Sequence, residues 1–211
     1  MVTEATPIVR ADSDGQHAAA TCLLEGAVAV VPTDTVYGLA ARPDQADAVR
    51  AVYRLKGRPG GMHLPVLAAS VSQVRALGVQ FTPAAEVLAR RWWPGPLTLA
   101  FGFEPTLERP SWLNGRVEVA VRIPDHDFLR ALLEQTGVLV VTSANPHGEP
   151  TARTARDVMR GLGPAVELVV DGGALQDVPS TLVNVSGPEP SVEREGAIPG
   201  QAITDALQEA R

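Results

Sequence analysis

The chain has 211 residues, of which 45% are hydrophobic and 20% are charged, and its 18 basic and 24 acidic residues give a net charge of −6. This composition is typical of a globular protein, and a chain of this length buries roughly 70% of its unfolded surface without disulfides. The acidic balance argues against a protein that holds nucleic acid through a broadly basic surface.

Two features bear on the compartment. The single cysteine, Cys22, lies in the apolar run AAATCLL, which predicts a buried, inert thiol rather than a nucleophile or a metal ligand. The N-terminal residues mix acidic and polar side chains, and apolar runs such as AVAVV are short, so we expect neither a signal peptide nor a membrane-spanning segment. A reducing, cytoplasmic location without membrane contact is predicted.

Short β-branched runs alternate with longer amphipathic runs along the chain. The short runs predict strands at residues 26–31, 64–69, 96–103, 117–123, 138–142, 166–170 and 180–185. Apolar residues at helical spacing predict helices at residues 44–56, about 82–93 and 125–136. Patterns of the capping-box type begin at Ser70 and Thr154 and predict two further helix starts.

This alternation predicts an α/β fold with a mixed sheet, because the runs at residues 96–103 and 117–123 follow one another without an obvious helix between them. Their connection, residues 104–116, is expected to lie on the surface. Trp92 and Trp93 are expected in the core. Near the C-terminus, the extended piece SVEREGAI is expected either to return to the sheet or to lie over a cleft.

Two loops follow early predicted elements and carry polar residues. Thr33 and Thr35, in PTDTVYGL, come directly after a strand, where they either shape a turn or present hydroxyls to a ligand. Lys56 and Arg58, in a glycine-rich loop, either offset the dipole of the preceding helix or clamp a phosphate or carboxylate.

Further candidates occur later in the chain, each open to a purely structural interpretation. Arg122 ends a strand as an exposed charge or an anion ligand. Small polar residues follow two other strands or turns, where they would either shape turns or recognise a ligand. They are Thr142, Ser143, Asn145 and Thr151 in VVTSANPHGEPT, and Ser180 and Thr181 after DGGALQDVP. Arg194, in VEREGAIPG, is a further candidate.

Other chemistries lack their sequence signatures. The four histidines, His17, His63, His126 and His147, do not have metal-ligand spacing, so no protein-bound metal site is predicted. The chain has no GxxxxGK[ST] loop, GxGxxG fingerprint or GxSxG elbow. Any nucleotide would therefore be held by another device, and covalent catalysis is not favoured.

Taken together and in this order, PTDTVYGL, KGRP, RWWPGPLT, VAVRIP, TSAN, DGG with ST, and REGAIPG resemble the YrdC/Sua5 family, also called TsaC, the L-threonylcarbamoyladenylate synthases. The resemblance covers roughly residues 16–200. It implies a single YrdC-like domain over residues 1–211, without the additional C-terminal domain of the longer Sua5 type. The implied fold is a twisted mixed α/β sheet with flanking helices around a large, positively lined concave cleft.

The resemblance also implies an activity. L-Threonine, bicarbonate and ATP would become threonylcarbamoyl-AMP and pyrophosphate, the first step in making N6-threonylcarbamoyladenosine in tRNA. Mg²⁺ would be bound mostly through the triphosphate. Transient contact with tRNA or with the threonylcarbamoyl transferase proteins is implied by the pathway.

By the same resemblance, Lys56, Arg58, Ser143 and Asn145 form the KxR and SxN elements and would hold the ATP phosphates, with Lys56 and Arg58 stabilising charge in the reaction. Thr151 and Arg194 are similar to nucleotide-contacting positions. Thr33, Arg122, Ser180 and Thr181 would face threonine, and Arg122 would pair with its carboxylate.

One segment departs from the family pattern. After KGRP, family members usually have Lys or His followed by Pro and Leu, whereas this chain has Met62, His63 and Leu64. Either His63 supplies the missing contact with threonine, which we favour, or threonine binds more weakly here.

Two alternatives remain at this stage. An RNA-binding or ribosome-associated module would also use a positively lined concave surface, although the acidic charge weighs against it. Carbamoyl-adenylate chemistry with another acyl group would use the same cleft, but the carbamoyltransferases that use it are larger, multidomain chains.

Overall fold

The computed structural model describes residues 6–57, 64–162, 166–176 and 178–210. The strands are β1 (Ile8–Arg10), β2 (Ala29–Val31), β3 (Gly38–Ala41), β4 (Val66–Leu67), β5 (Leu97–Gly102), β6 (Glu118–Arg122), β7 (Leu139–Ser143), β8 (Leu168–Asp171), β9 (Thr181–Asn184) and β10 (Ser191–Arg194). The helices are α1 (Ser13–Leu24), α2 (Ala46–Lys56), α3 (Val71–Arg75), α4 (Pro83–Trp92), α5 (Asp127–Thr136), α6 (Ala155–Leu162) and α7 (Gly200–Glu209).

All these strands join one mixed sheet in the order β1-β8-β2-β3-β7-β4-β6-β5-β9-β10, which confirms the predicted fold class. Each predicted strand forms, most of them in shortened form and β7 shifted by one residue. β5 and β6 pair antiparallel, with Leu99 opposite Val121. The piece SVEREGAI returns to the sheet as β10, antiparallel to β9. Trp92 and Trp93 pack against the core as expected.

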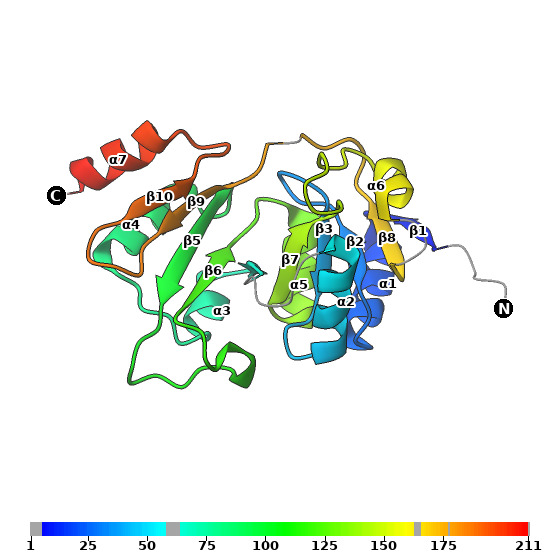
Figure 1. The fold of residues 1–211 in the computed structure, drawn as a ribbon, viewed down its shortest axis with the longest axis horizontal. Helices are drawn as coiled ribbons and strands as arrows, with labels where there is room; N and C mark the ends of the chain where they lie inside the picture. Colours follow the sequence, from blue (N-terminus) through cyan, green and yellow to red (C-terminus); the bar gives the residue numbers. More distant parts are fainter. Residues whose placement is uncertain (1–5, 58–63, 163–165, 177, 211) are drawn as a thin grey trace.

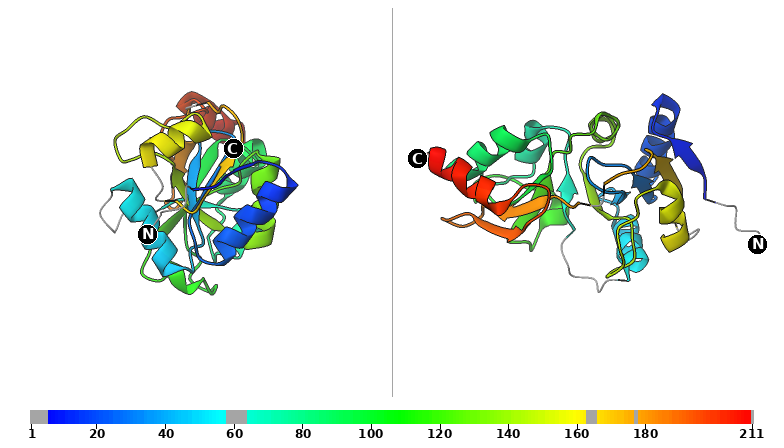
Figure 2. Two further views of the ribbon diagram at one scale, coloured as in Figure 1. Left: turned by 90° about the vertical axis from the view of Figure 1, so that its right-hand side faces the viewer. Right: turned by 90° about the horizontal axis from the view of Figure 1, so that it is seen from above.

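One half of the molecule, built on β1, β8, β2, β3 and β7, has helices on both faces of the sheet (Figures 1 and 2). Alternate residues of β2 serve the two faces because side chains alternate along a strand. Val30 belongs to the core that includes α2 and α6, whereas Ala29 and Val31 belong to the core that includes α1 and α5.

In the other half, built on β4, β6, β5, β9 and β10, side chains alternate between a core and a cavity. Leu97 and Leu99 of β5 face the core that includes α4 and α7. The intervening residue Thr98 lines a cavity, as do Arg122 of β6 and Leu182 of β9. This half of the sheet therefore has one core face and one face that carries the site.

Side-chain caps define several helix starts. The Gln73 amide donates to Ser70 Oγ at 3.4 Å, and the Asp157 amide donates to Thr154 Oγ1 at 3.1 Å, so both predicted helix starts are confirmed. At its other end, α2 stops at Gly57, whose φ of 61° is the left-handed conformation that glycine tolerates best. This turn follows Lys56 directly.

The Cys22 thiol is expected to react slowly. Cys22 is half-buried rather than fully buried as predicted; it packs against the core that includes α1 and α5, and burial, followed by the charges of Glu167 and Glu25, raises its pKa to about 11. Because the thiolate is the nucleophile, alkylation by iodoacetamide at pH 7.5 should be on the order of 100-fold slower than for free cysteine. Denaturant should abolish the difference, and a native rate within threefold of free cysteine would contradict this assignment.

Within the described ranges, no helix combines the length and apolar character needed to cross a membrane.

Candidate active site

A cavity of about 430 Å³ lies where the two halves of the sheet meet. Its walls come from the β2–β3 loop, from residues in or next to the strands β3, β4, β5, β6 and β7, from the loop after β7, and from β9, the residues before it, and β10. Eight of the candidate residues line it: Thr33, Thr35, Arg122, Thr142, Ser143, Thr151, Ser180 and Arg194. The fold therefore brings together residues from both ends of the chain.

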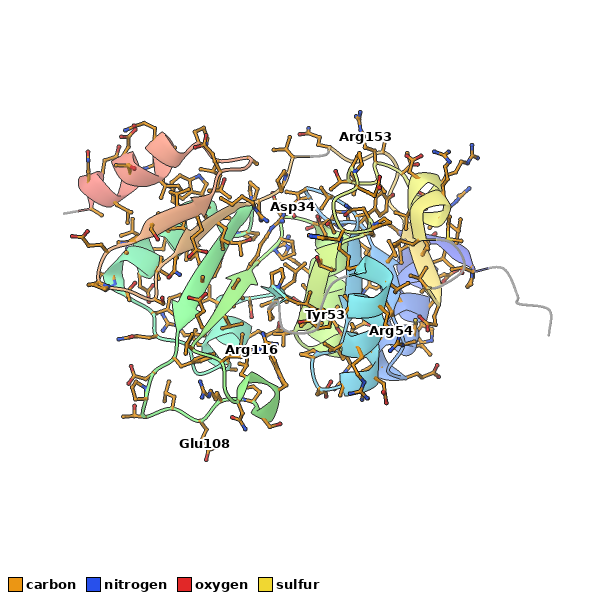
Figure 3. All side chains as sticks on the ribbon, viewed as in Figure 1. Asp34, Tyr53, Arg54, Glu108, Arg116 and Arg153 are labelled. Carbon is orange, nitrogen blue, oxygen red and sulfur yellow. The ribbon has the colours of Figure 1, made fainter. Side chains whose placement is uncertain are left out.

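Arg122 is 5% exposed and is held in three directions. Its Nε donates to the Gly95 carbonyl at 3.0 Å, its Nη1 donates to Thr35 Oγ1 at 2.8 Å, and its Nη2 forms an ion pair with Asp34. Figure 3 shows Asp34 between the two halves of the molecule. Each terminal nitrogen carries two N–H groups, so one on each remains after these three bonds. Two such donors suit a carboxylate.

The PTDT segment is organised by a chain of hydroxyls. Thr33 Oγ1 donates to the Val36 carbonyl at 2.8 Å and accepts from the amides of Thr35 and Val36 at 3.0 and 3.1 Å. The Thr33 and Thr35 hydroxyls also lie 3.0 Å from each other. Thr33 therefore shapes the turn as well as lining the cavity, and Thr35 connects it to Arg122.

Tyr37 attaches this segment to the DGG turn. Its hydroxyl donates to the Gly173 carbonyl at 2.6 Å and accepts from the Gly172 amide at 3.0 Å. Burial, more than any other cause, raises the pKa of Tyr37 to about 12, so the phenol stays protonated. The two motifs thus support each other behind the cavity wall.

Arg194 brings a second guanidinium to the cavity. It donates through Nε and Nη2 to the Ser180 carbonyl at 3.3 and 3.0 Å, and through Nη2 to Ser180 Oγ at 3.3 Å. Burial and then the positive charge of Arg122 lower the pKa of Arg194. An anion bound between the two guanidinium groups would relieve this repulsion, so the cavity favours anionic ligands.

Two predicted phosphate ligands lie behind the wall instead. Lys56 is 1% exposed. Its Nζ donates to the Ser143 carbonyl at 2.7 Å and to the Asn145 carbonyl. The side-chain oxygens Ser143 Oγ and Asn145 Oδ1 each lie 3.1 Å from the same Nζ. Asn145 Nδ2 donates to the carbonyls of Pro146 and Glu149 at 3.0 and 2.6 Å. Lys56 and Asn145 therefore shape the loop that presents Ser143.

Thr181 also lies behind the wall. Its Oγ1 donates to the Ile198 carbonyl at 2.6 Å and accepts from the amides of Gly196 and Ile198, both at 3.0 Å. A Cβ on Gly196 would lie 2.3 Å from the Pro179 carbonyl oxygen, so only glycine lets the tail pass so closely. This contact explains the glycine of REGAIPG and fixes the strand that carries Arg194.

Two candidates, Arg58 and His63, lie outside the described residues, as does Met62. Two other residues at the site were not singled out from the sequence: Asp34, paired with Arg122, and Thr98, whose Oγ1 lies 2.7 Å from Ser180 Oγ. Thr98 had a signal, since it is a polar residue in the apolar run PLTLAFGF. In the described part of the chain, no group of three His, Cys, Asp or Glu residues is arranged to hold a metal ion.

Comparisons with known proteins identify the family of this chain. A family model described as "Telomere recombination", for Sua5, YciO and YrdC, matches residues 21–196. The threonylcarbamoyl-AMP synthase of Bacillus subtilis is 37% identical over 194 residues, which are 90% of this chain and 56% of that protein. The threonylcarbamoyl-AMP synthase of Marinobacter nauticus is 39% identical over 152 residues, 71% of this chain and 80% of that protein.

A solved structure also matches. Pyrococcus abyssi Sua5, complexed with L-threonine, superposes with a TM-score of 0.88 at 32% identity, covering 97% of this chain and 62% of that chain. This chain spans 56% and 57% of the lengths of the B. subtilis and P. abyssi relatives. The motifs, the cavity that they surround and these matches show that the chain belongs to the Sua5/YciO/YrdC family.

Proposed function

We propose that this protein converts L-threonine, bicarbonate and ATP into threonylcarbamoyl-AMP and pyrophosphate. The observation that carries the proposal is the convergence of Arg122 and Arg194 on one cavity with the hydroxyls of Thr33, Ser143 and Ser180. It is supported by relatives that are named threonylcarbamoyl-AMP synthase, and by a similar structure that contains L-threonine.

The chemistry asks the protein for positioning and charge stabilisation. The threonine amine and bicarbonate give a carbamate and water. A carbamate oxygen then attacks the α-phosphorus of ATP in line, forming the P–O bond of the mixed anhydride while the bond to pyrophosphate breaks. No protein nucleophile is needed, so fixed cations and hydrogen-bond donors are the appropriate catalytic groups.

We assign the residues to a threonine side and a nucleotide side of the cavity. Arg122 pairs with the threonine carboxylate through its two remaining N–H groups, and Thr33 and Ser180 lie around it. Ser143, Thr151 and Arg194 form the nucleotide side, with Lys56 and Asn145 holding the Ser143 loop from behind and Thr181 holding the tail. Arg58 is proposed to bind ATP phosphates and His63 to contact threonine.

Mg²⁺ is proposed to enter as part of the MgATP substrate. Among the described residues, those that line the cavity are uncharged apart from the two arginines, and Mg²⁺ prefers carboxylate, phosphate and water oxygens. The triphosphate is therefore the source of its ligands.

Removal of Mg²⁺ should stop turnover while leaving the fold intact. Without the ion, the phosphates lose the charge neutralisation that bond cleavage requires, whereas no described cluster makes the fold depend on a metal. Pyrophosphate release should fall to background in EDTA and return with excess Mg²⁺. A change of the far-ultraviolet circular dichroism of the apo protein on adding EDTA would contradict this expectation.

The direct test is pyrophosphate release by the purified protein with MgATP, omitting threonine and bicarbonate in turn. The proposal expects release only when both are present. Release with a different acyl substrate in place of threonine would favour carbamoyl-adenylate chemistry with another acyl group. Failure to bind ATP, together with tRNA binding that falls steeply with salt in a gel-shift titration, would instead identify an RNA-binding module.

The location and macromolecular partners are also proposals. A cytoplasmic location is supported by the single, protected Cys22. Because a mixed anhydride is reactive, a transferase must consume the product. The net charge of −6 favours only transient contact with tRNA or the transferase proteins.

A further inference from the structure

We propose that Thr98 is a positioning residue that directs the Ser180 hydroxyl toward the substrate, an inference that rests on the proposed function. Thr98 lies on β5, is 5% exposed and lines the cavity. Its Oγ1 is 2.7 Å from Ser180 Oγ. The contact joins an interior strand of the sheet to the segment that precedes β9.

The Ser180 hydroxyl can donate only one hydrogen bond, so the direction of its hydrogen bond with Thr98 matters. A hydroxyl has one donor and two acceptor positions. One acceptor position faces Arg194 Nη2 at 3.3 Å. If Ser180 donated to Thr98, it would have no hydrogen left for an anionic ligand. If Thr98 donates, Ser180 accepts from Thr98 and Arg194 and its own hydrogen is available to an oxygen in the cavity.

A bound carboxylate or carbamate selects the second arrangement. Its oxygens only accept hydrogen bonds, so they draw the Ser180 hydrogen toward the cavity. The Thr98 hydrogen is then best satisfied by Ser180 Oγ, since a buried hydroxyl without a partner is costly. All three positions of the Ser180 hydroxyl are used in the liganded state.

The placement of the two hydroxyls makes Thr98 the fixed member of the pair. Thr98 lies on a strand paired on both sides, with β6 and β9, and a β-branched side chain has few rotamers in a strand. Ser180 precedes β9, in a segment without regular secondary structure. Thr98 therefore determines the orientation of Ser180.

The test compares L-threonine binding by calorimetry in the full-length protein and two variants. Thr98→Val removes the hydroxyl while keeping the shape, and should raise the Kd for threonine roughly 3- to 10-fold, the effect of one hydrogen bond. The Kd for ATP should change less than twofold. Thr98→Ser should restore most of the lost affinity. The matched control is Thr106→Val, the same change in the connection between β5 and β6.

A second comparison separates positioning from a general structural effect. In a Ser180→Ala background, Thr98→Val should weaken threonine binding by less than twofold, because the hydroxyl through which it acts has gone. Equal weakening in both backgrounds would overturn the proposal, as would a parallel loss of ATP affinity. No threonine binding by the parent would overturn the proposed function itself, whereas equal affinities of parent and Thr98→Val would overturn only the role of Thr98.

Discussion

Replacing Lys56 by alanine should lower both turnover and the free energy of unfolding. The change removes the ammonium that contacts the backbone carbonyls of Ser143 and Asn145 and the Asn145 side chain in a fully buried position. Buried acceptors left without donors should cost about 3 kcal/mol in total. Turnover should fall on the order of 100-fold or more, because the loop that presents Ser143 loses its support and the site loses a positive charge.

Chemical denaturation and pyrophosphate release measure the two effects. Arg50→Ala is the matched control, since Arg50 lies on the same helix but is exposed and pairs with Asp47 on the surface; it should leave both quantities nearly unchanged. If Lys56→Ala lost turnover but kept the parental free energy of unfolding, Lys56 would act on ATP alone and the loop-supporting role would be wrong.

Replacing Arg122 by lysine should lower kcat/KM for threonine by about 100- to 1000-fold, although the charge is retained. Lysine has one nitrogen and cannot bond Gly95, Thr35 and Asp34 while also presenting two N–H groups to a carboxylate. A loss of 2.7 to 4 kcal/mol, about the contribution of a fixed charged donor in a dry site, corresponds to this range.

Initial rates of pyrophosphate release should be measured at varied threonine and at varied ATP. The KM for ATP should change much less than kcat/KM for threonine, because the nucleotide side is assigned to other residues. Arg90→Lys, at an exposed position of α4, makes the same substitution as a control. Equal losses toward threonine and ATP would show that Arg122 supports the cavity as a whole rather than the carboxylate.

Much of the fold could be predicted because it follows from short-range patterns. The runs that became β5, β6 and β7 are rich in apolar and β-branched residues, and Ser70 and Thr154 mark helix starts by local hydrogen bonds. β1 and β3 were not predicted, and β3 is GLAA, which has little intrinsic strand preference. α1 and α7 were missed as well. The extent of the domain, 1–211 without a further C-terminal domain, stays a prediction.

The site was predictable only in part. The residues of PTDTVYGL, TSAN and REGAIPG could be named as candidates. Which of them line the cavity and which hold the lining residues in place could not be predicted, because this depends on long-range contacts. Lys56 and Ser143 are 87 positions apart, and Thr98 and Ser180 are 82 apart. A lysine that binds a phosphate and a lysine that binds carbonyl groups look the same in a sequence.

The cavity wall begins near Thr33 and is completed by Arg194, so the proposed substrate site requires residues from almost the whole chain. During synthesis, the site cannot form until residue 194 has left the ribosome, and a fragment lacking β10 should have no measurable affinity for either substrate. Ligands that bind only the completed site stabilise the native state as a unit. Threonine and ATP should therefore slow proteolysis at places far from the cavity, wherever cleavage requires global unfolding.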